Sequence, residues 1–306
     1  MPVLAAKTFA PVHTWLPPWG LGACIRAVLM RSTVGMTLSA SQRWAHYPAS
    51  PICAINCLFE GHAELVTPGH ARHEDAPRQR LPSMTVSGPH TQPQTVFYDA
   101  PSRGVMVIFY PDAWWALTGI SVAALTDRVV DASEVLPAPL VAACERMFEP
   151  VDDDVCVARF FEDVLSLWQQ RVHGRAHSSW QAQDWSQSLT PWMESLAMRA
   201  AATGWGRSLR QTERRVKAWT GWSLRKLQGS ARGEAVFFAV MDAMDRDCLD
   251  WSQVALEHGF SDQSHFIRET RRITGFSPEV LRQGLFNDEA FWCYRAWAKM
   301  AGYEFA

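Results

Sequence analysis

The residues best suited to chemistry are the basic and amide side chains of one short segment, residues 261–274. Ser264, Arg268 and Arg272 recur every four residues, so they share one side of a helix. Guanidinium groups bind guanine edges and phosphates, and an amide such as that of Gln263 pairs with adenine. The chemistry indicated is recognition of double-stranded DNA by a helix lying in the major groove.

Such a helix must be positioned by its neighbours. Residues 250–258 favour a short preceding helix that ends at Gly259, which tolerates left-handed backbone. Ser261 is the expected N-cap of the second helix, and Asp262 suits the positive end of its dipole. The stripe opposite the basic face should face a core, and it comprises Phe266, Thr270 and Ile273. Together these features predict a helix-turn-helix.

A second copy of the pattern lies upstream, at residues 208–223. Ser208 and Gln211 have the spacing of a capping box. The helix then presents Arg210, Arg214 and Lys217 on one side. It ends in a Thr-Gly-aromatic-Ser sequence that recurs at residues 274–277, which indicates an internal duplication. Residues 224–247 should form a helix that holds the two reading helices at a fixed separation, so that one chain reads two adjacent major grooves about 34 Å apart.

At this point the C-terminal hundred residues resemble the AraC/XylS family of bacterial transcription regulators. Residues 255–278 carry the specific motif A-x3-G-F-S-D-Q-S-H-F-x2-E-x3-I-T-G-F-S-P. The upstream copy resembles the family less closely, because Thr212 stands where the family more often has Leu and Val216 where it often has Phe. The resemblance implies base contacts from two sets of residues: Arg210, Glu213 and Arg214 in the first helix, and Gln263, Ser264, Ile267 and Arg268 in the second. From their positions on the two helices, we add Lys217 to the first set, and His265 and Arg272 to the second.

The first half of the chain has a different residue pattern from the second half. Short runs rich in β-branched and aromatic residues, at 53–59, 95–98 and 104–110, predict strands separated by Pro and Gly turns. The polar stretch 69–82 reads as a loop. This half weakly resembles the cupin-like small barrels that serve as sensory domains of such regulators. A small effector would enter the barrel mouth, where the candidate wall residues are Trp44, Tyr47, Phe59, Phe97 and Tyr98, although each is more simply explained as barrel core.

Composition restricts the classes of protein that remain. A formal net charge of −2 over 306 residues excludes bulk-charge coating of nucleic acid, so DNA binding needs a local basic face. Seven scattered cysteines favour a reducing, cytoplasmic protein without a disulfide framework, and no segment reads as a membrane span or secretory signal. Cys53 and Cys57 lie on one side of a strand and, with His70 and His73, raise the alternative of a metal site, but their spacing is incomplete for zinc and we assign no metal.

We therefore predict an α+β chain with a β-rich, cupin-like sensory or dimerisation domain at residues 1–175, including trailing helices, and an all-helical domain with two helix-turn-helix motifs at 185–306. The function predicted is sequence-specific transcription regulation, with no cofactor and no enzymatic activity. Expected partners are operator DNA, a small effector, a second copy and RNA polymerase. The alternatives are a cupin-type metal enzyme fused to a DNA module, and a regulator whose first half only dimerises or meets another protein. The tail at 287–303 reads as an extra helix on the DNA-binding domain or as a dimer contact.

Overall fold

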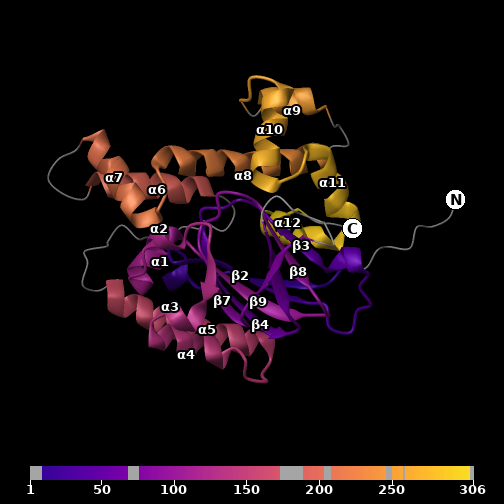
Figure 1. Ribbon diagram of the computed structural model, residues 1–306. Helices are drawn as coiled ribbons and strands as arrows, with labels where there is room; N and C mark the ends of the chain where they lie inside the picture. Colours follow the sequence, from indigo (N-terminus) through magenta and orange to yellow (C-terminus); the bar gives the residue numbers. More distant parts are fainter. Residues whose placement is uncertain are drawn as a thin grey trace.

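The computed structural model describes residues 9–67, 76–172, 189–202, 208–245, 250–257 and 259–303. Strands dominate up to residue 131 and helices dominate beyond it (Figure 1). The predicted α+β fold, with a β-rich first part and a helical last part, is confirmed. The boundary that we predicted, between residues 175 and 185, lies outside the described residues and stays a prediction.

The first part contains two antiparallel sheets. The larger has the order β1-β2-β9-β4-β7-β10 and the smaller the order β3-β8-β5-β6. The strands are β1 Val12–Trp15, β2 Ile25–Ser32, β3 Trp44–Tyr47, β4 Cys53–Glu60, β5 Ala63–Val66, β6 Arg78–Arg80, β7 Met84–Ser87, β8 Gln94–Tyr98, β9 Arg103–Phe109 and β10 Val129–Asp131. Strands β4, β8 and β9 confirm the three predicted runs.

One prediction in this part is wrong. Residues 78–80 belong to an edge strand, β6, although we expected a loop over the whole of 69–82. Side-chain packing explains the strand, because Arg78 lies over the rings of Phe97 and Trp44 and forms an ion pair with Glu64 on β5. An edge strand needs a ladder partner on one side only, which suits a polar sequence.

Helices cover the outer face of the larger sheet. They are α1 Pro111–Thr118, α2 Val122–Leu125, α3 Ala132–Val135, α4 Ala138–Arg146 and α5 Asp153–Val172, with short 3-10 turns η1 Trp19–Leu21 and η2 Ala40–Arg43 elsewhere. The apolar stripe of α5, with Phe160, Val164 and Trp168, is buried against this face. The strand side chains that point to it include Val28, Met30 and Val107, and all are buried. This is the main hydrophobic core.

The second part consists of helices that rest on the first (Figure 1). They are α6 Leu189–Ala202, α7 Leu209–Thr220, α8 Leu224–Asp245, α9 Trp251–Glu257, α10 Gln263–Thr274, α11 Pro278–Asn287, η3 Glu289–Phe291 and α12 Trp292–Met300. The main core continues into this part through Trp192, Val216 and Trp222. Within the described ranges, no helix combines the length and apolar character that crossing a bilayer requires.

The C-terminal tail joins the two parts. Helix α12 packs against β1 and β3 of the first part as well as against α11. Trp292 meets Tyr47 edge-on at a centroid distance of 5.8 Å, and Trp297 stacks on Phe237 of α8 at 4.6 Å. The tail is therefore an extra helix, as one of our two readings had it, but it packs on the sheets as much as on the helical part.

Candidate nucleic-acid interface and internal cavity

Helices α9 and α10 form the downstream helix-turn-helix. Phe260 fills the corner after Gly259 and packs edge-on against Phe266 of α10. The cap differs from our expectation, because Asp262 is the N-cap and its carboxylate accepts a 2.7 Å hydrogen bond from the backbone N–H of His265. Ser261 instead donates to Asp262. The His265 N–H, with help from Ser261, holds the pKa of Asp262 below its usual value, so the cap is charged at neutral pH.

Helix α10 separates its two faces as the spacing predicts. The inward residues Phe266, Thr270 and Ile273 are buried. The candidate reading residues Gln263, Ser264, Arg268 and Arg272 are exposed, and His265 and Ile267 are half-buried. Arg272 also pairs with Glu269 one turn earlier, at 2.9 Å. A polar, cation-bearing face is therefore open to solvent along the whole helix.

Helix α7 presents a comparable face. Arg210, Glu213, Arg214 and Lys217 are all exposed, while Val216 and Thr220 are buried. The predicted capping box is absent, since Ser208 occupies the N-cap position without a side-chain hydrogen bond. The first motif thus has the exposed polar face that we expected, but its N-cap lacks the side-chain hydrogen bond that the second motif has.

The two reading helices end in the same way. Gly221 and Gly275 both take left-handed backbone, with φ of +73° and +82°. In each helix the preceding threonine hydroxyl lies 2.7–2.8 Å from the carbonyl oxygen four residues back and 3.1 Å from that of the following aromatic residue. The repeated Thr-Gly-aromatic-Ser sequence therefore corresponds to a repeated structure.

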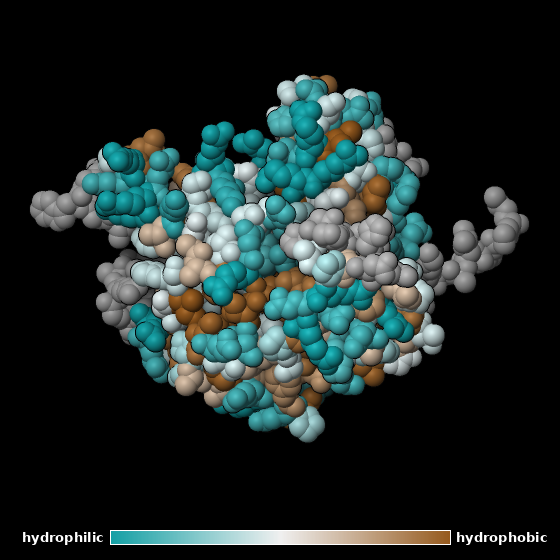
Figure 2. All heavy atoms as spheres, in the orientation of Figure 1, coloured by the Kyte–Doolittle hydropathy of each residue, from teal (hydrophilic) through white to brown (hydrophobic). Residues whose placement is uncertain are grey.

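Helix α8 connects the motifs. Its 22 residues correspond to about 33 Å at 1.5 Å per residue. It packs on α6 and α7 and also on α9 and α10. Figure 2 shows hydrophilic side chains gathered over α7, at the upper left, and over α9 and α10, at the top. Near the middle of α8, helices α8 and α10 approach so closely that a Cβ on Gly233 would lie 1.8 Å from Ile273 Cδ1, whereas one on Gly229 would meet only Arg272, at 3.8 Å.

A cavity of about 220 Å³ lies between the two sheets. Helices also contribute to its wall, through Ser230 and Glu234 of α8, Ile273 of α10 and Trp292 of α12. Two of the five candidate wall residues, Tyr47 and Tyr98, line it, and their hydroxyls are 3.2 Å apart.

The other three candidate wall residues have packing roles. Trp44 and Phe97 meet edge-on at a centroid distance of 5.0 Å beneath Arg78, and Phe59 packs on Phe148. None of the three is among the residues that line the cavity. For these positions the structure therefore favours the alternative reading of ordinary core side chains.

Two buried ion-pair systems that we did not predict lie at this cavity. Arg26 of β2 pairs with Glu234 of α8 at 2.5 Å. Glu234 also accepts hydrogen bonds from the Leu189 N–H and from Trp297 Nε1. Burial is the largest single influence and lowers the pKa of Arg26, but the charge of Glu234, the charge of Tyr110 and the hydrogen bond to Glu234 together outweigh it, so the net pKa is raised.

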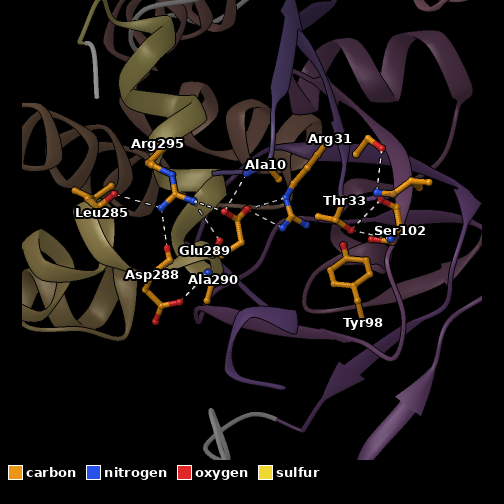
Figure 3. Close-up of polar contacts among 12 residues, drawn as sticks. Ala10, Arg31, Thr33, Tyr98, Ser102, Leu285, Asp288, Glu289, Ala290 and Arg295 are labelled. Atoms are coloured by element: carbon orange, nitrogen blue, oxygen red, sulfur yellow. Dashed lines mark hydrogen bonds and ion pairs between the residues drawn. The ribbon is translucent and has the colours of Figure 1, made fainter. Parts of the chain in front are cut away.

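The second system centres on Glu289, which lies between Arg31 of β2 and Arg295 of α12 (Figure 3). Arg31 is 2.8 Å and Arg295 3.4 Å from the carboxylate, which also accepts from the backbone N–H of Ala10. Burial lowers the pKa of Arg295 to about 10, although Glu289 acts in the opposite direction, so Arg295 stays charged at neutral pH. The only hint in the sequence was the two arginines of the otherwise apolar run 25–31.

The cysteines carry no comparable arrangement. Cys53 and Cys57 face the main core, as their spacing predicts, and both are free thiols. A hydrogen bond with Cys144, together with burial, raises the pKa of Cys57, which makes it a poor nucleophile. His70 and His73 lie outside the described residues. Within the described part, no three His, Cys, Asp or Glu side chains are grouped so as to hold a metal ion.

Comparisons with known proteins give structural likeness only. No family model and no curated protein matches the sequence. Among solved structures, ToxT from Vibrio cholerae is similar, with 11% identity over 89% of this chain and 97% of ToxT and a TM-score of 0.36. ToxT from Vibrio cholerae O395 has 14% identity over 78% and 93% with a TM-score of 0.35, and unsaturated fatty acid bound ToxT has 11% over 91% and 96% with 0.36. At this level of likeness, the function must be argued from the chain's own residues.

Proposed function

We propose that this chain is a sequence-specific DNA-binding transcription regulator that places α7 and α10 in two adjacent major grooves of one duplex. The observation that carries the proposal is that two exposed helices with basic side chains, α7 and α10, both pack on one connecting helix, α8. Successive major grooves on one face of B-form DNA lie about 34 Å apart, and packing on a shared connector would hold the two helices in one fixed arrangement toward them. Helix α7 lies directly before the first turn of α8, and α10 crosses α8 near its middle, at Gly233.

The second motif supplies the better-defined reading surface. Arg268 is suited to bidentate contact with guanine, and Gln263, in the first turn, to adenine. Arg272, held by Glu269, is better placed for a phosphate. Ser264, His265 and Ile267 complete this set of candidate contacts.

The first motif reads the other groove. Arg210 and Arg214 lie one turn apart with Glu213 beside them, and an exposed carboxylate can accept from a cytosine amino group. Lys217 lies near the end of the helix and is suited to a phosphate. Because the chain has a net charge of −2, these local faces, and not bulk charge, must provide the attraction to DNA.

Selection of random-sequence duplexes with the full-length chain tests this proposal. The enriched sequences are expected to contain two conserved segments separated by one helical turn, about 10 base pairs centre to centre. Enrichment of a single short segment, or no enrichment above random sequence, would contradict it.

We further propose that occupancy of the cavity controls DNA binding. Its wall includes residues of the connector α8 and of the reading helix α10, so a ligand there touches the elements that set the position of both reading helices. A larger side chain at Ala54, which lines the cavity, occupies the space from within. Ala54→Leu should change operator affinity. Unchanged affinity and unchanged reporter output in cells would favour a first part that only dimerises or meets another protein.

In this proposal the chain acts in the cytoplasm, with RNA polymerase and a second copy of itself as further partners. A reporter gene carrying the selected sequence tests the regulatory step. Deletion of the chain's gene from the source cell should change reporter expression, and restoration of the wild-type chain should reverse that change.

A further inference from the structure

The walls of the cavity can be placed row by row from the strand register. On the larger sheet, Leu29 of β2, Met106 of β9, Asn56 of β4 and Thr85 of β7 lie side by side across four strands. In a neighbouring row, Ile108, Ala54 and Ser87 lie side by side. All these side chains line the cavity. These two rows are therefore apolar over β2 and β9 and polar where β4 meets β7.

Asn56 is the centre of the polar region. Its amide Nδ2 donates to Ser87 Oγ at 3.0 Å and approaches Thr85 Oγ1 at 3.4 Å. Among the described residues, the amide oxygen Oδ1 of Asn56 has no hydrogen-bond partner, and it is not one of the fully covered polar atoms. An amide in the middle of a sheet face therefore offers an acceptor to whatever occupies the cavity.

The charged groups at the wall are already neutralised. Arg26 is paired with Glu234, and Arg31 with Glu289. Burial lowers the pKa of His90, a further lining residue, to about 4, with Asp127 acting in the opposite direction, so His90 is neutral at pH 7. An anion in the cavity would have to break one of these buried pairs or remain without a countercharge, and both are costly.

We propose that the cavity binds a neutral, largely apolar molecule carrying a hydroxyl group, which donates a hydrogen bond to Asn56 Oδ1. The proposal rests on the effector-dependent function proposed above and names the class of its ligand. A volume of about 220 Å³ is below the range of about 300–1,000 Å³ typical of drug-sized ligands, which favours one ring with a short chain. A ring in the cavity would contact polarizable side chains, namely Met106, Met300 and Trp292.

Three compounds of one shape test the ligand class: 4-propylphenol, propylbenzene and 4-propylbenzoate. Calorimetric titration of the full-length chain at neutral pH is expected to show the phenol binding about 2- to 12-fold more tightly than the hydrocarbon. The benzoate should bind at least about 100-fold more weakly than the phenol. Tightest binding of the benzoate, lost in Arg26→Gln or Arg31→Gln, would overturn the proposal in favour of an anionic ligand. No binding of any of the three would also overturn it.

A pair of variants tests the position of the hydroxyl. Asn56→Leu removes the acceptor at similar volume, and phenol binding should weaken about 5- to 150-fold, because the ligand hydroxyl is then buried without a partner. Binding of propylbenzene should be equal or tighter, which shows that the cavity is intact. Gln94→Leu, which removes an amide from the facing sheet, should keep the preference for the phenol. Equal losses in both variants would overturn the assignment to Asn56.

DNA binding measured on the same protein distinguishes failure of the proposed ligand class from failure of the proposed function. Specific binding to the selected duplex, without a preference for the phenol, would overturn the ligand class and leave DNA reading in place. Absence of specific DNA binding would overturn the proposed function itself.

Discussion

Arg26 on β2 and Glu234 on α8 form a buried ion pair with an Nη2–Oε1 distance of 2.5 Å, although 208 positions separate them in the chain. Arg26 falls at an irregularity in the pairing of β2 with β9, where the register shifts between Ile25 and Ala27. A bulge of this kind re-aims a side chain. Here the irregularity coincides with the point at which the sheet is tied to the helix that connects the two reading motifs.

Breaking this pair on one side should destabilise the protein strongly. Glu234→Gln leaves the Arg26 guanidinium buried without its countercharge, and the free energy of unfolding should fall by about 3–5 kcal/mol. Urea denaturation measures the loss. The double variant Arg26→Met/Glu234→Met is the control. Its loss of unfolding free energy should be smaller than the sum of the losses in the single variants Arg26→Met and Glu234→Met. Additive losses would mean that the two side chains do not interact in solution.

Two glycines on α8 should respond in opposite directions to the same change. Gly233→Ala places a methyl group against Ile273, which must shift, and the expected loss of stability is about 1–3 kcal/mol. Gly229→Ala has room, and the better helix propensity of alanine should add up to about 1 kcal/mol. Thermal denaturation of both variants checks the pair. A stabilised Gly233→Ala would show that α8 and α10 do not approach this closely.

The cap of α10 should make the second motif sensitive to acid. The pKa of Asp262 is lowered in the folded chain by the His265 N–H, so the stabilisation is fully present above the pKa of an unfolded aspartate, about 3.9, and is lost as pH falls through the lower folded value. Asp262→Ala should therefore be less stable than the wild type at pH 7, and the difference should shrink at low pH. A difference that is independent of pH would exclude a charged cap.

Arg268 should be the most sensitive position for sequence recognition. Arg268→Ala removes a bidentate base contact worth about 1–3 kcal/mol, which weakens binding to the selected duplex by about 5- to 150-fold. Titration of a labelled duplex measures this loss. Arg159→Ala, an exposed arginine on α5 paired with Glu149, removes the same charge far from either reading helix and should change little. Equal effects of the two variants would indicate attraction by net charge alone.

Local patterns in the sequence predicted local structure well. The spacing of Phe266, Thr270 and Ile273 correctly predicted the buried face of α10, because helical periodicity depends only on neighbours along the chain. The error at its start is a displacement of one residue, since Ser261 and Asp262 are adjacent and both residue types are good N-caps. Residues 78–80 form a strand because Arg78 packs on Phe97, and no local pattern records that contact.

The cavity and its lining could not be predicted from the sequence. Among five candidate wall residues only Tyr47 and Tyr98 line it, because facing the interior of a β-sandwich depends on sheet register and on which sheet a strand joins. Asn56 lies in an apolar run and acquires meaning only when β7 brings Thr85 and Ser87 beside it. Polar residues inside predicted strands were the one available signal.

Chemical footprinting of the full-length chain on its selected duplex tests the central claim most directly. Protection of major-groove guanine N7 atoms is expected in two segments on one face of the DNA, about 10 base pairs apart. Arg214→Ala should remove protection from one segment only and Arg268→Ala from the other only. A single protected segment, or loss of both segments in each variant, would contradict a chain that reads two grooves with two helices set apart by α8.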